Sequence, residues 1–254
     1  MKKEFYVHKT DALVDLEKEW DLLNNDWGKR FELKYDEGMS YLEIYMREDY
    51  FKGECIVKPG DTVVDIGANV GIFTSLAFDM GASRVIGFEP FIKNFELAKK
   101  NNPNAEIYNL AVSNKIEELQ LYYTPTGCGG HSTVKDYCES KTNHFTEHFT
   151  VKTTTLNDII EDNFLIKIDF LKVDTEGSEL LIFEGLSDDN LDKISSIALE
   201  YHHFMFNYDD SVYDNFQRRF MKKGFNVFTR ILDRDTRMVY MKRGDVFVNN
   251  PKHW

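Results

Sequence analysis

The hydrophobic and polar positions of this chain alternate between short apolar runs and stretches with helical spacing. The apolar runs, rich in β-branched residues, predict strands at 62–67, 84–89, 105–112, 170–174 and 196–201. Helical spacing between several of them predicts helices at 72–80, 93–101 and 180–185. Because continuously apolar strands that alternate with helices are typical of a parallel sheet covered on both faces, the pattern predicts an α/β fold.

The beginning of the chain departs from this alternation. Helical spacing at 11–24 and 41–51 predicts an N-terminal helical extension over residues 1–52. A turn signal, KPGD at 58–61, follows it. We therefore expect one large α/β domain to occupy residues 53–254.

Two later segments add to this plan. The runs 225–231 and 237–243 flank a short polar turn and predict an antiparallel hairpin at the end of the sheet. Residues 113–157 are irregular, with a Gly-rich and Ser/Thr-rich stretch between two alternating runs. Long insertions in α/β domains often carry substrate contacts, so we expect this one to lie over the active site.

The composition excludes some classes of partner. The formal net charge is −12 at pH 7, and such a chain has no bulk attraction for phosphate backbones or anionic lipid, so neither nucleic acid nor a membrane is expected. Acids interrupt the N-terminal apolar residues, unlike the apolar stretch of a signal peptide, and the three cysteines contain no CxxC pair. These features predict a cytoplasmic protein with free thiols and leave the oligomeric state open.

The strongest local signal is the stretch VVDIGANVGIFTSLAF. An apolar strand ends at Asp65, and a turn with Gly67 and Gly71 opens a helix. Glycines allow a sharp turn and the close approach of a ligand, and a helix N-terminus offers unpaired N–H groups. The next strand ends in Glu89, where a carboxylate can accept from both ribose hydroxyls of a nucleoside, and the Phe91 ring can lie against an adenine face.

A dinucleotide fold is the competing interpretation of this loop. Its fingerprint is G-x-G-x-x-G, whereas the spacing here is G-A-N-V-G with Asp65 before the first glycine. A carboxylate would repel a pyrophosphate, but it attracts an ammonium or sulfonium group. The loop therefore favours S-adenosylmethionine over NAD, while a tight turn without a ligand stays an alternative.

Several motifs occur together in one order. These are VVDIGANVGIFT, VIGFEP, NLAVSN, TLNDII, FLKVDTEGSELLIFEGL and ALEYHH. In this order they resemble the FkbM family of S-adenosylmethionine-dependent methyltransferases, over roughly residues 55–245. The resemblance implies a Rossmann-like sheet of seven strands with the last one antiparallel, and O-methylation of sugar or secondary-metabolite hydroxyls.

The resemblance also implies roles for individual residues in the cofactor site. It assigns to the loop around the methionine part the residues Asp65, Gly67, Asn69 and Gly71. It implies that Glu89 binds the ribose hydroxyls, and it places Asn109 and Ala111 where such folds line the adenine pocket.

The remaining chemistry is expected where the fourth and fifth strands end. Asp174 and Glu176 follow one strand, and Glu200, His202 and His203 follow the other, so neighbouring strands bring the two sets together. A sugar hydroxyl is a poor nucleophile and needs a base or a metal to remove its proton. In one mechanism His202 or Asp174 is the base and Glu200 supports it. In the other, Asp174, Glu200 and His202 hold a divalent cation; the metal-free base is our prediction.

Other polar residues are weaker candidates. His131 is a further base candidate, and Ser132 beside it can bond to substrate. Glu176 and His203 are candidate substrate contacts, although loop support and a solvent-facing position are the simpler interpretations. Glu179 is expected to stabilise the start of the following helix.

The resemblance therefore implies an O-methyltransferase that acts on a carbohydrate hydroxyl, and by family analogy the carbohydrate is an activated sugar for a surface polysaccharide. The alternative enzyme methylates a lipid or secondary-metabolite hydroxyl. A protein that binds S-adenosylmethionine without turnover is the alternative of another class.

Overall fold

The computed structural model describes most of the chain after the N-terminal segment. The described residues are 44–45, 48–123, 131–133, 147–202, 210–232 and 236–244. The expected helix at 11–24, residue His203 and the turn at 233–235 lie outside them.

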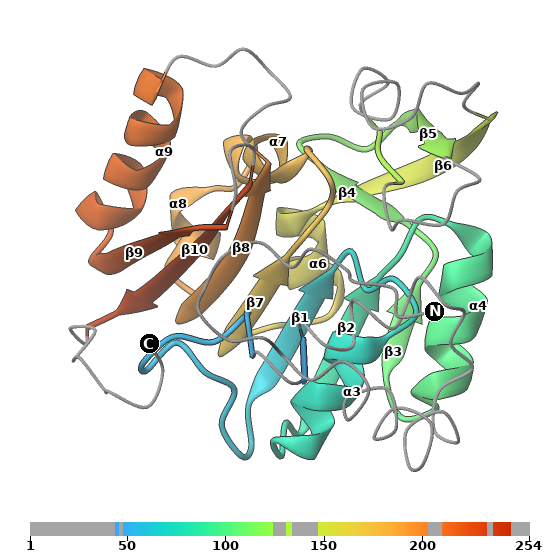
Figure 1. Ribbon diagram of the computed structural model, residues 1–254, viewed down its shortest axis with the longest axis horizontal. Helices are drawn as coiled ribbons and strands as arrows, with labels where there is room; N and C mark the ends of the chain where they lie inside the picture. Colours follow the sequence, from blue (N-terminus) through green and yellow to red (C-terminus); the bar gives the residue numbers. More distant parts are fainter. Residues whose placement is uncertain are drawn as a thin grey trace, which may run out of the picture.

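A seven-stranded sheet forms the centre of the molecule (Figure 1). In chain order its strands are β1 (Thr62–Ile66), β2 (Arg84–Phe88), β3 (Glu106–Tyr108), β7 (Phe170–Val173), β8 (Ser196–His202), β9 (Phe225–Ile231) and β10 (Thr236–Arg243). Their spatial order is β3-β2-β1-β7-β8-β10-β9. The five strands from β3 to β8 are parallel, and β10 runs antiparallel to both β8 and β9. The predicted α/β sheet with a C-terminal antiparallel hairpin is confirmed.

The strand order reverses between β1 and β7. From β1 the chain builds outward through β2 and β3, and it then returns to place β7 and β8 on the other side. Ligands of open α/β sheets bind in the crevice beyond the carboxyl ends of the strands at such a switch point. The segments that follow β1 and β7 are therefore the place to look for the site.

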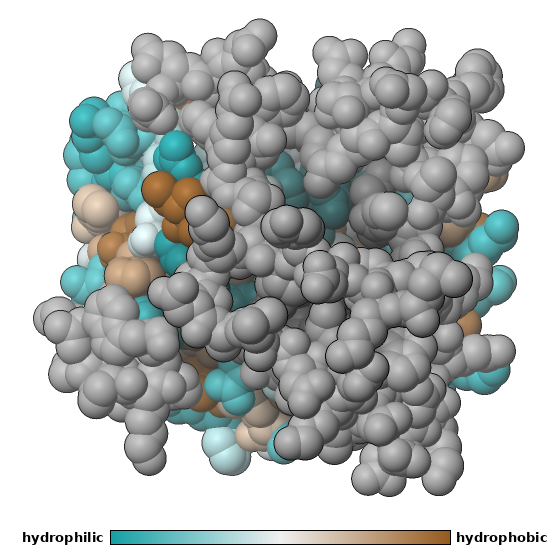
Figure 2. All heavy atoms as spheres, viewed as in Figure 1, coloured by the Kyte–Doolittle hydropathy of each residue, from teal (hydrophilic) through white to brown (hydrophobic). Residues whose placement is uncertain are grey.

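Helices cover both faces of the sheet. One face packs against α6 (Leu156–Asp162), α7 (Glu179–Glu184), α8 (Asp188–Leu191) and α9 (Asp210–Lys222), through residues such as Ile159, Phe183 and Phe220. The opposite face packs against α3 (Ile72–Asp79), with Phe73 and Leu76 in the core, and Leu97 of α4 (Ile92–Asn101) borders that core. The outer side of α9, at the left of the view, is hydrophilic (Figure 2).

The strand predicted at 105–112 is two strands in two sheets. Residues 106–108 form β3 at the edge of the large sheet, whereas β4 (Ala111–Ser113) pairs with β6 (Glu147–Thr155). The break falls at Asn109, whose side-chain amide donates to the carbonyls of Glu89 (2.9 Å) and Pro90 (2.8 Å). The prediction of one continuous strand was therefore wrong, because a side-chain contact with the β2 end interrupts it.

The described part of the insertion forms a small sheet. β5 (Glu118–Tyr123) pairs antiparallel with β6, and the order of the three strands is β4-β6-β5. Figure 1 shows this sheet beyond the carboxyl ends of β1 and β2. The expected alternating runs are thus strands.

The end of the N-terminal segment packs on the domain. A helix was expected to continue to Phe51, but residues 48–51 form a turn in which Glu48 has a φ of +51° and its carbonyl accepts from the Phe51 N–H at 2.8 Å. The Phe51 ring lies 5.6 Å from Phe170 and 6.0 Å from Phe73, centroid to centroid. Burial of this apolar side chain favours the turn over a continued helix. The boundary between residues 52 and 53 stays a prediction.

Candidate active site

The loop after β1 has the backbone that its glycines predict. Gly67 and Gly71 have φ values of +78° and +84°, and Asn69 between them also lies in the left-handed region, with a φ of +50°. A Cβ at Gly67 would stand 1.7 Å from the carbonyl oxygen of Asp174, so only glycine lets the loops after β1 and β7 approach this closely. At Gly71 a Cβ would meet the Asn102 amide at 2.3 Å. Gly67 thus lets the two strand ends meet, and Gly71 lets the start of α3 lie against the end of α4.

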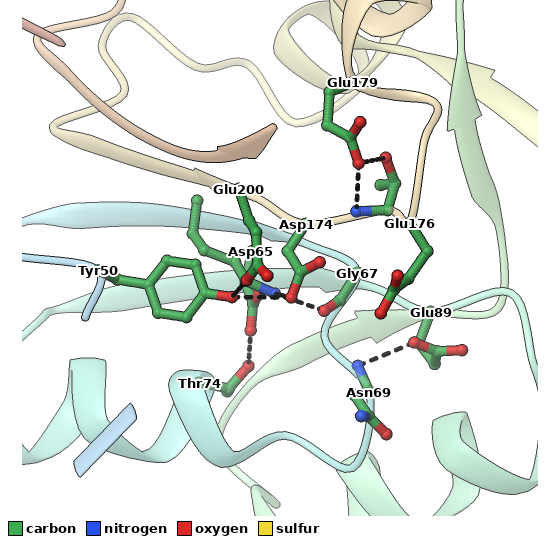
Figure 3. A network of polar contacts seen from close by, with 12 residues as sticks. Tyr50, Asp65, Gly67, Asn69, Thr74, Glu89, Asp174, Glu176, Glu179 and Glu200 are labelled. Carbon is green, nitrogen blue, oxygen red and sulfur yellow. Dashed lines mark hydrogen bonds and ion pairs between the residues drawn. The ribbon is translucent and has the colours of Figure 1, made fainter. Parts of the chain in front are cut away.

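Glu89 projects from the end of β2 into the same crevice. One of its carboxylate oxygens accepts from the Asn69 N–H and the other from the Phe91 N–H, both at 2.8 Å (Figure 3). Burial raises the pKa of Glu89 to about 7, although these two hydrogen bonds act in the opposite direction. The loop therefore fixes a carboxyl group that titrates near neutral pH.

Asp65 belongs to a buried group of three residues, Asp65, Thr74 and Lys172, which we call the Lys172 cluster. Asp65 accepts from the Thr74 hydroxyl at 2.7 Å and lies 3.3 Å from the Lys172 ammonium. The ammonium also donates to the Gly67 carbonyl at 2.6 Å. Burial acts to lower the pKa of Lys172, but Asp65 and Asp174 raise it above its usual value, so the side chain is charged. Asp65 is thus fully buried behind the loop, and its predicted contact with a ligand ammonium stays a prediction.

Asp174 and Glu200 lie side by side at the ends of β7 and β8. Val173 pairs with Leu199, so the next residue of each strand stands at the same level. The Tyr50 hydroxyl lies 2.7 Å from Asp174 and 3.0 Å from Glu200, as Figure 3 shows. The sequence prediction that the two strands bring these carboxylates together agrees with this geometry.

His202 is surrounded by acids in a group that we call the His202 cluster: Glu176, Glu179 and His202. Its Nδ1 lies 3.0 Å from Glu179, and its Nε2 lies 3.3 Å from Glu176 and 3.7 Å from Glu200. Burial acts to lower the pKa of His202, but Glu179, Glu176 and Glu200 together raise it well above its usual value. An imidazole that already holds its proton is a poor base, so the geometry favours Asp174 over His202 for that role.

Glu179 stabilises the loop before α7. Its carboxylate accepts from the N–H groups of Gly177 (2.8 Å) and Thr175 (3.2 Å) and is almost fully buried. Glu176 has a φ of +55°, and its carbonyl accepts from the Ser132 hydroxyl at 2.6 Å. The sequence allowed the Glu176 side chain to bond to backbone N–H groups of this loop. In the structure the Glu179 side chain makes those bonds, and Glu176 contributes its backbone carbonyl.

A cavity of about 340 Å³ connects these groups. Its polar lining comprises Asn69, Glu89, Asn94, Thr133, Lys172, Asp174, Thr175, Glu176, Ser178, Glu200, His131 and Tyr50. The rest of the lining is largely apolar and includes Ile72, Phe73 and Leu110. Its volume lies within the roughly 300–1,000 Å³ of small-molecule sites. In Figure 2, hydrophilic residues are visible at the bottom of a recess near the centre of the face shown.

Three predicted residues come from or contact the insertion. His131 lines the cavity, and burial lowers its pKa to about 4, so its imidazole is neutral at pH 7. Its ring lies 4.6 Å from the Phe91 ring, centroid to centroid, and Phe91 is buried behind the cavity lining. Ser132 is fully buried with its hydroxyl on the Glu176 carbonyl. Their predicted contacts with substrate or adenine stay predictions.

The two residues predicted for the adenine pocket have different positions. Ala111 is buried and lines the cavity, whereas Asn109 is exposed and holds the β2 end through the carbonyls of Glu89 and Pro90. Asn109 thus shapes the site through the backbone that carries Glu89.

A cation is the other group that the site can hold. One ligand atom each from Asp174, Glu176 and His202 lies within 4.8 Å of the others. Glu176 takes the place that the sequence prediction gave to Glu200. Because His202 holds its proton between acids, a metal would have to displace that proton before Nε2 can bind it.

Among the cavity residues that sequence reasoning missed, Lys172 and Tyr50 have the closest contacts with the predicted acids. Lys172 lies inside the KVD motif, where a strand lysine was given no role, and Tyr50 lies in the predicted N-terminal extension. A lysine inside an otherwise apolar strand is a usable signal, since a buried ammonium needs a carboxylate partner. Nothing in the local sequence indicates Tyr50.

The strand order, the glycine loop and the acid at the end of β2 together define a methyltransferase-type α/β domain. A sequence model described as "Methyltransferase FkbM domain" matches residues 65–227, more than half of the chain. The chain belongs to this family.

Curated relatives cover parts of the chain. Methyltransferase 1 of Beauveria bassiana is 29% identical in an alignment that covers 56% of this chain and 65% of that protein. The 31-O-demethyl-FK506 methyltransferase FkbM of Streptomyces tacrolimicus is 24% identical over 64% of this chain and 73% of its own. The AMB antimetabolite synthetase AmbE of Pseudomonas aeruginosa is 24% identical over 64% of this chain, which spans only 9% of AmbE.

Solved structures are similar at low identity. The human methyltransferase 10 domain containing protein aligns with a TM-score of 0.47 and 14% identity, over 88% of this chain and 92% of that one. TrmK of M. capricolum, in complex with S-adenosylhomocysteine, aligns with a TM-score of 0.46 and 8% identity, over 80% and 69%. With TM-scores below 0.5, the fold assignment depends on the strand order described above.

Proposed function

We propose that this protein is an S-adenosylmethionine-dependent O-methyltransferase that acts on a hydroxyl of a carbohydrate. The observation that carries the proposal is Glu89, whose carboxyl group is held by the backbone of the glycine loop inside a cavity at the switch point of the sheet. A carboxyl group in that position suits the ribose hydroxyls of a nucleoside. Membership of the family supports a methyl-transfer reaction.

The donor set of the cavity fits a cationic cofactor. Among the described residues, Glu89, Asp174, Glu176 and Glu200 line it, together with the ammonium of Lys172, which is already bound to Asp65 and the Gly67 carbonyl. Such a lining attracts a sulfonium and repels a pyrophosphate. When bound, S-adenosylmethionine supplies an electrophilic methyl group on positively charged sulfur. Residues 67–71 and Glu89 would hold it.

The residues of the chain then position the acceptor and take its proton. The bound cofactor would donate its methyl group to the acceptor oxygen and keep the sulfur–carbon electron pair, while a base of this chain would take the hydroxyl proton. Asp174 is the base in this proposal, because it lines the cavity with its side chain one-quarter exposed, whereas His202 is already protonated. The cavity walls would hold the two reactants in line. No metal is needed for this assignment.

The charge of the cavity lining restricts the class of acceptor molecule. Among the residues that the structure describes, the carboxylates favour an uncharged hydroxyl compound over one that carries phosphates. A neutral glycan or sugar is therefore preferred to a nucleotide-activated sugar. Nucleic acid and membrane surfaces are not proposed as partners, in keeping with the net charge of −12. No helix among the described residues is both long enough and apolar enough to cross a membrane.

A secondary-metabolite hydroxyl is the second candidate acceptor. The Streptomyces tacrolimicus relative is named for 31-O-demethyl-FK506, a name that describes O-methylation of such a compound. The apolar part of the lining, with Ile72, Phe73 and Leu110, is compatible with a less polar acceptor.

Calorimetry tests the cofactor. We expect heat with S-adenosylmethionine and with S-adenosylhomocysteine, and none with NAD. Absence of heat with both sulfur compounds would refute the proposal.

A screen with methyl-labelled S-adenosylmethionine tests the acceptor. Neutral glycans, nucleotide sugars and macrolide alcohols are offered in parallel, and label in a neutral glycan is the expected result. Label in the macrolide alone would favour the second candidate. Binding without transfer to any compound would favour the non-catalytic alternative.

A further inference from the structure

Tyr50 reaches the active site from outside the matched family domain. That match begins at residue 65, yet the Tyr50 side chain is only 4% exposed and lines the cavity. Its ring meets Phe73 edge to face at 5.5 Å, and the Lys172 ammonium lies 5.4 Å from the ring centre. The ring is therefore held on two sides, and the hydroxyl has a defined direction.

The segment around Tyr50 is tied to the far end of the sheet. The neighbouring Asp49 forms an ion pair with Arg230 of β9 at 2.8 Å, and its carbonyl accepts from the Tyr240 hydroxyl of β10. On the other side, Phe51 packs on Phe170. These contacts place Tyr50 beside the ends of strands that lie more than 100 residues later in the chain.

The Tyr50 hydroxyl, with its single proton, is a hydrogen-bond donor shared by two carboxylates. It lies 2.7 Å from Asp174 Oδ2 and 3.0 Å from Glu200 Oε2. Burial, followed by Asp174 and Glu200, raises the pKa of Tyr50 well above its usual value, so the phenol stays protonated and acts as a donor. A shared donor keeps two neighbouring carboxylates at a fixed separation despite their repulsion.

Asp174 and Glu200 differ in the contacts of their carboxylate oxygens. The two oxygens of Glu200 face Tyr50 and His202, at 3.0 and 3.7 Å. Asp174 Oδ2 faces Tyr50 and Lys172, at 2.7 and 3.7 Å. Within the described part of the chain, Asp174 Oδ1 is the oxygen that neither of these partners faces, and Figure 3 shows it directed away from Tyr50.

We propose that Tyr50 is a positioning residue of the methyl-transfer reaction, which fixes Asp174 with its Oδ1 presented to the acceptor hydroxyl and uses Glu200 as the second anchor. The inference rests on the proposed function for the reaction itself. The acceptor proton passes to Asp174 Oδ1, while Tyr50 keeps its own proton. The segment before the family domain is thus part of the active site.

Carboxyl NMR tests the link between Tyr50 and Asp174 without any acceptor. The protein is labelled with ¹³Cγ-aspartate, and Asp174→Asn identifies the Asp174 resonance. In Tyr50→Phe the ring contacts remain while the donor is lost. Since a donor favours the ionised carboxylate, we expect the titration midpoint of Asp174 to move to higher pH. Tyr213→Phe is the matched control, because the Tyr213 hydroxyl bonds to Thr229 at 2.7 Å, the residue is equally buried, and it packs on the opposite face.

Kinetics test the effect on the reaction, with the acceptor found in the labelling screen. We expect kcat of Tyr50→Phe to fall roughly 10- to 100-fold, the range for losing a hydrogen bond to a charged group, while the affinity for S-adenosylmethionine changes less than threefold. The acid limb of the kcat profile moves to higher pH. Tyr213→Phe keeps wild-type values for all three.

The outcomes distinguish this proposal from the proposed function. An unchanged Asp174 midpoint in Tyr50→Phe refutes the positioning role, and so does an unchanged kcat. A fall in stability with no shift of the midpoint assigns Tyr50 a packing role only and also refutes it. If wild-type protein gives no heat with S-adenosylmethionine, the proposed function fails, while the NMR titration still decides whether Tyr50 controls Asp174.

Discussion

The Lys172 cluster and the His202 cluster neutralise buried acids in two different ways. In the first, the cation is an ammonium between Asp65 and Asp174, at 3.3 and 3.7 Å. In the second, it is an imidazolium between Glu179 and Glu176, at 3.0 and 3.3 Å. Both cations are buried, with side chains 3% and 5% exposed. Tyr50, Asp174 and Glu200 lie between them.

The difference lies in how each cation responds to pH. The pKa of Lys172 is raised from an already high value, so its charge persists wherever the protein is folded. The charge of His202 depends on its acidic neighbours, because an isolated imidazole titrates near pH 6.5. The Lys172 cluster is thus a permanent support of the glycine loop, and the His202 cluster is a support that alkali can remove.

The largest effect is expected from removing the ammonium. Lys172→Met leaves Asp65 buried without its cation, and such a loss costs about 3–5 kcal/mol of unfolding free energy. Urea unfolding at pH 7 measures it.

The double variant Asp65→Asn/Lys172→Met is the control. Without the buried charge it should recover much of the lost stability, since replacing both members of a buried pair costs far less than breaking it. A single variant within 1 kcal/mol of wild type would show that Lys172 is not the counter-charge of Asp65.

Glu89 contrasts with both clusters, because two backbone N–H groups hold its carboxyl group and no ion pair with a cation of the described residues does. Its pKa of about 7 means that the ionised form, the stronger acceptor for ribose hydroxyls, grows between pH 6 and 8. The affinity for S-adenosylmethionine should therefore rise over this range. Glu89→Gln should weaken binding by roughly 10- to 100-fold at pH 8, from the loss of a charge-assisted hydrogen bond. Calorimetry at three pH values checks both effects.

The pH dependence of Glu89→Gln is the control for that prediction. A glutamine does not titrate, so the affinity of the variant should change little between pH 6 and 8. An equally steep rise in the variant would mean that another group causes it.

The His202 cluster should weaken as the pH rises. The folded-state pKa of His202 is raised, so its contribution to stability is complete below pH 6.5, declines above it, and is lost once the pH passes the folded-state value. His202→Gln should cost about 2 kcal/mol near pH 6. The stability difference between wild type and variant should then shrink steadily towards pH 10.

Urea unfolding of both proteins across that range is the measurement. A constant difference between the two curves would mean that the imidazolium is not the source of the stability. Lys172→Met provides the comparison, because its cost should stay level over the same range.

The smallest effect is expected at an exposed ion pair. Lys58 and Glu54 lie 2.8 Å apart at i,i+4 spacing, with side chains about half exposed. Lys58→Ala should change the unfolding free energy by about 0.5 kcal/mol or less, because water and salt screen such pairs. A loss above 1 kcal/mol would contradict the expectation that exposed ion pairs in this protein stabilise the fold much less than buried ones do.

Local sequence was enough for most of the fold. The runs at 62–67, 84–89, 170–174 and 196–201 correspond to β1, β2, β7 and β8, because strands buried on both faces must be apolar throughout. The DIGANVG loop followed from the spacing of its glycines, and the family resemblance followed from six motifs in one order. The prediction failed at 105–112, where the Asn109 side chain ends β3 by a contact with residues of another strand.

Only part of the candidate site could be predicted from the sequence. Strand ends indicated Asp174, Glu200 and His202, because the carboxyl ends of parallel strands share one edge. The charge of His202 was not accessible, since Glu176 and Glu179 reach it across a loop. Nor was Tyr50, whose place depends on packing against Phe73.

The sequence by itself determined most strands of the sheet and the turn at Gly67, because these depend on periodicity and on backbone conformations that only certain residues adopt. Its motifs indicated the family. Tertiary structure alone decided which acid meets which cation and which oxygen of Asp174 faces Tyr50 and Lys172. Those outcomes depend on distances of a few ångströms between residues far apart in the chain, as between Tyr50 and Asp174, and Coulomb and hydrogen-bond energies fall steeply over such distances.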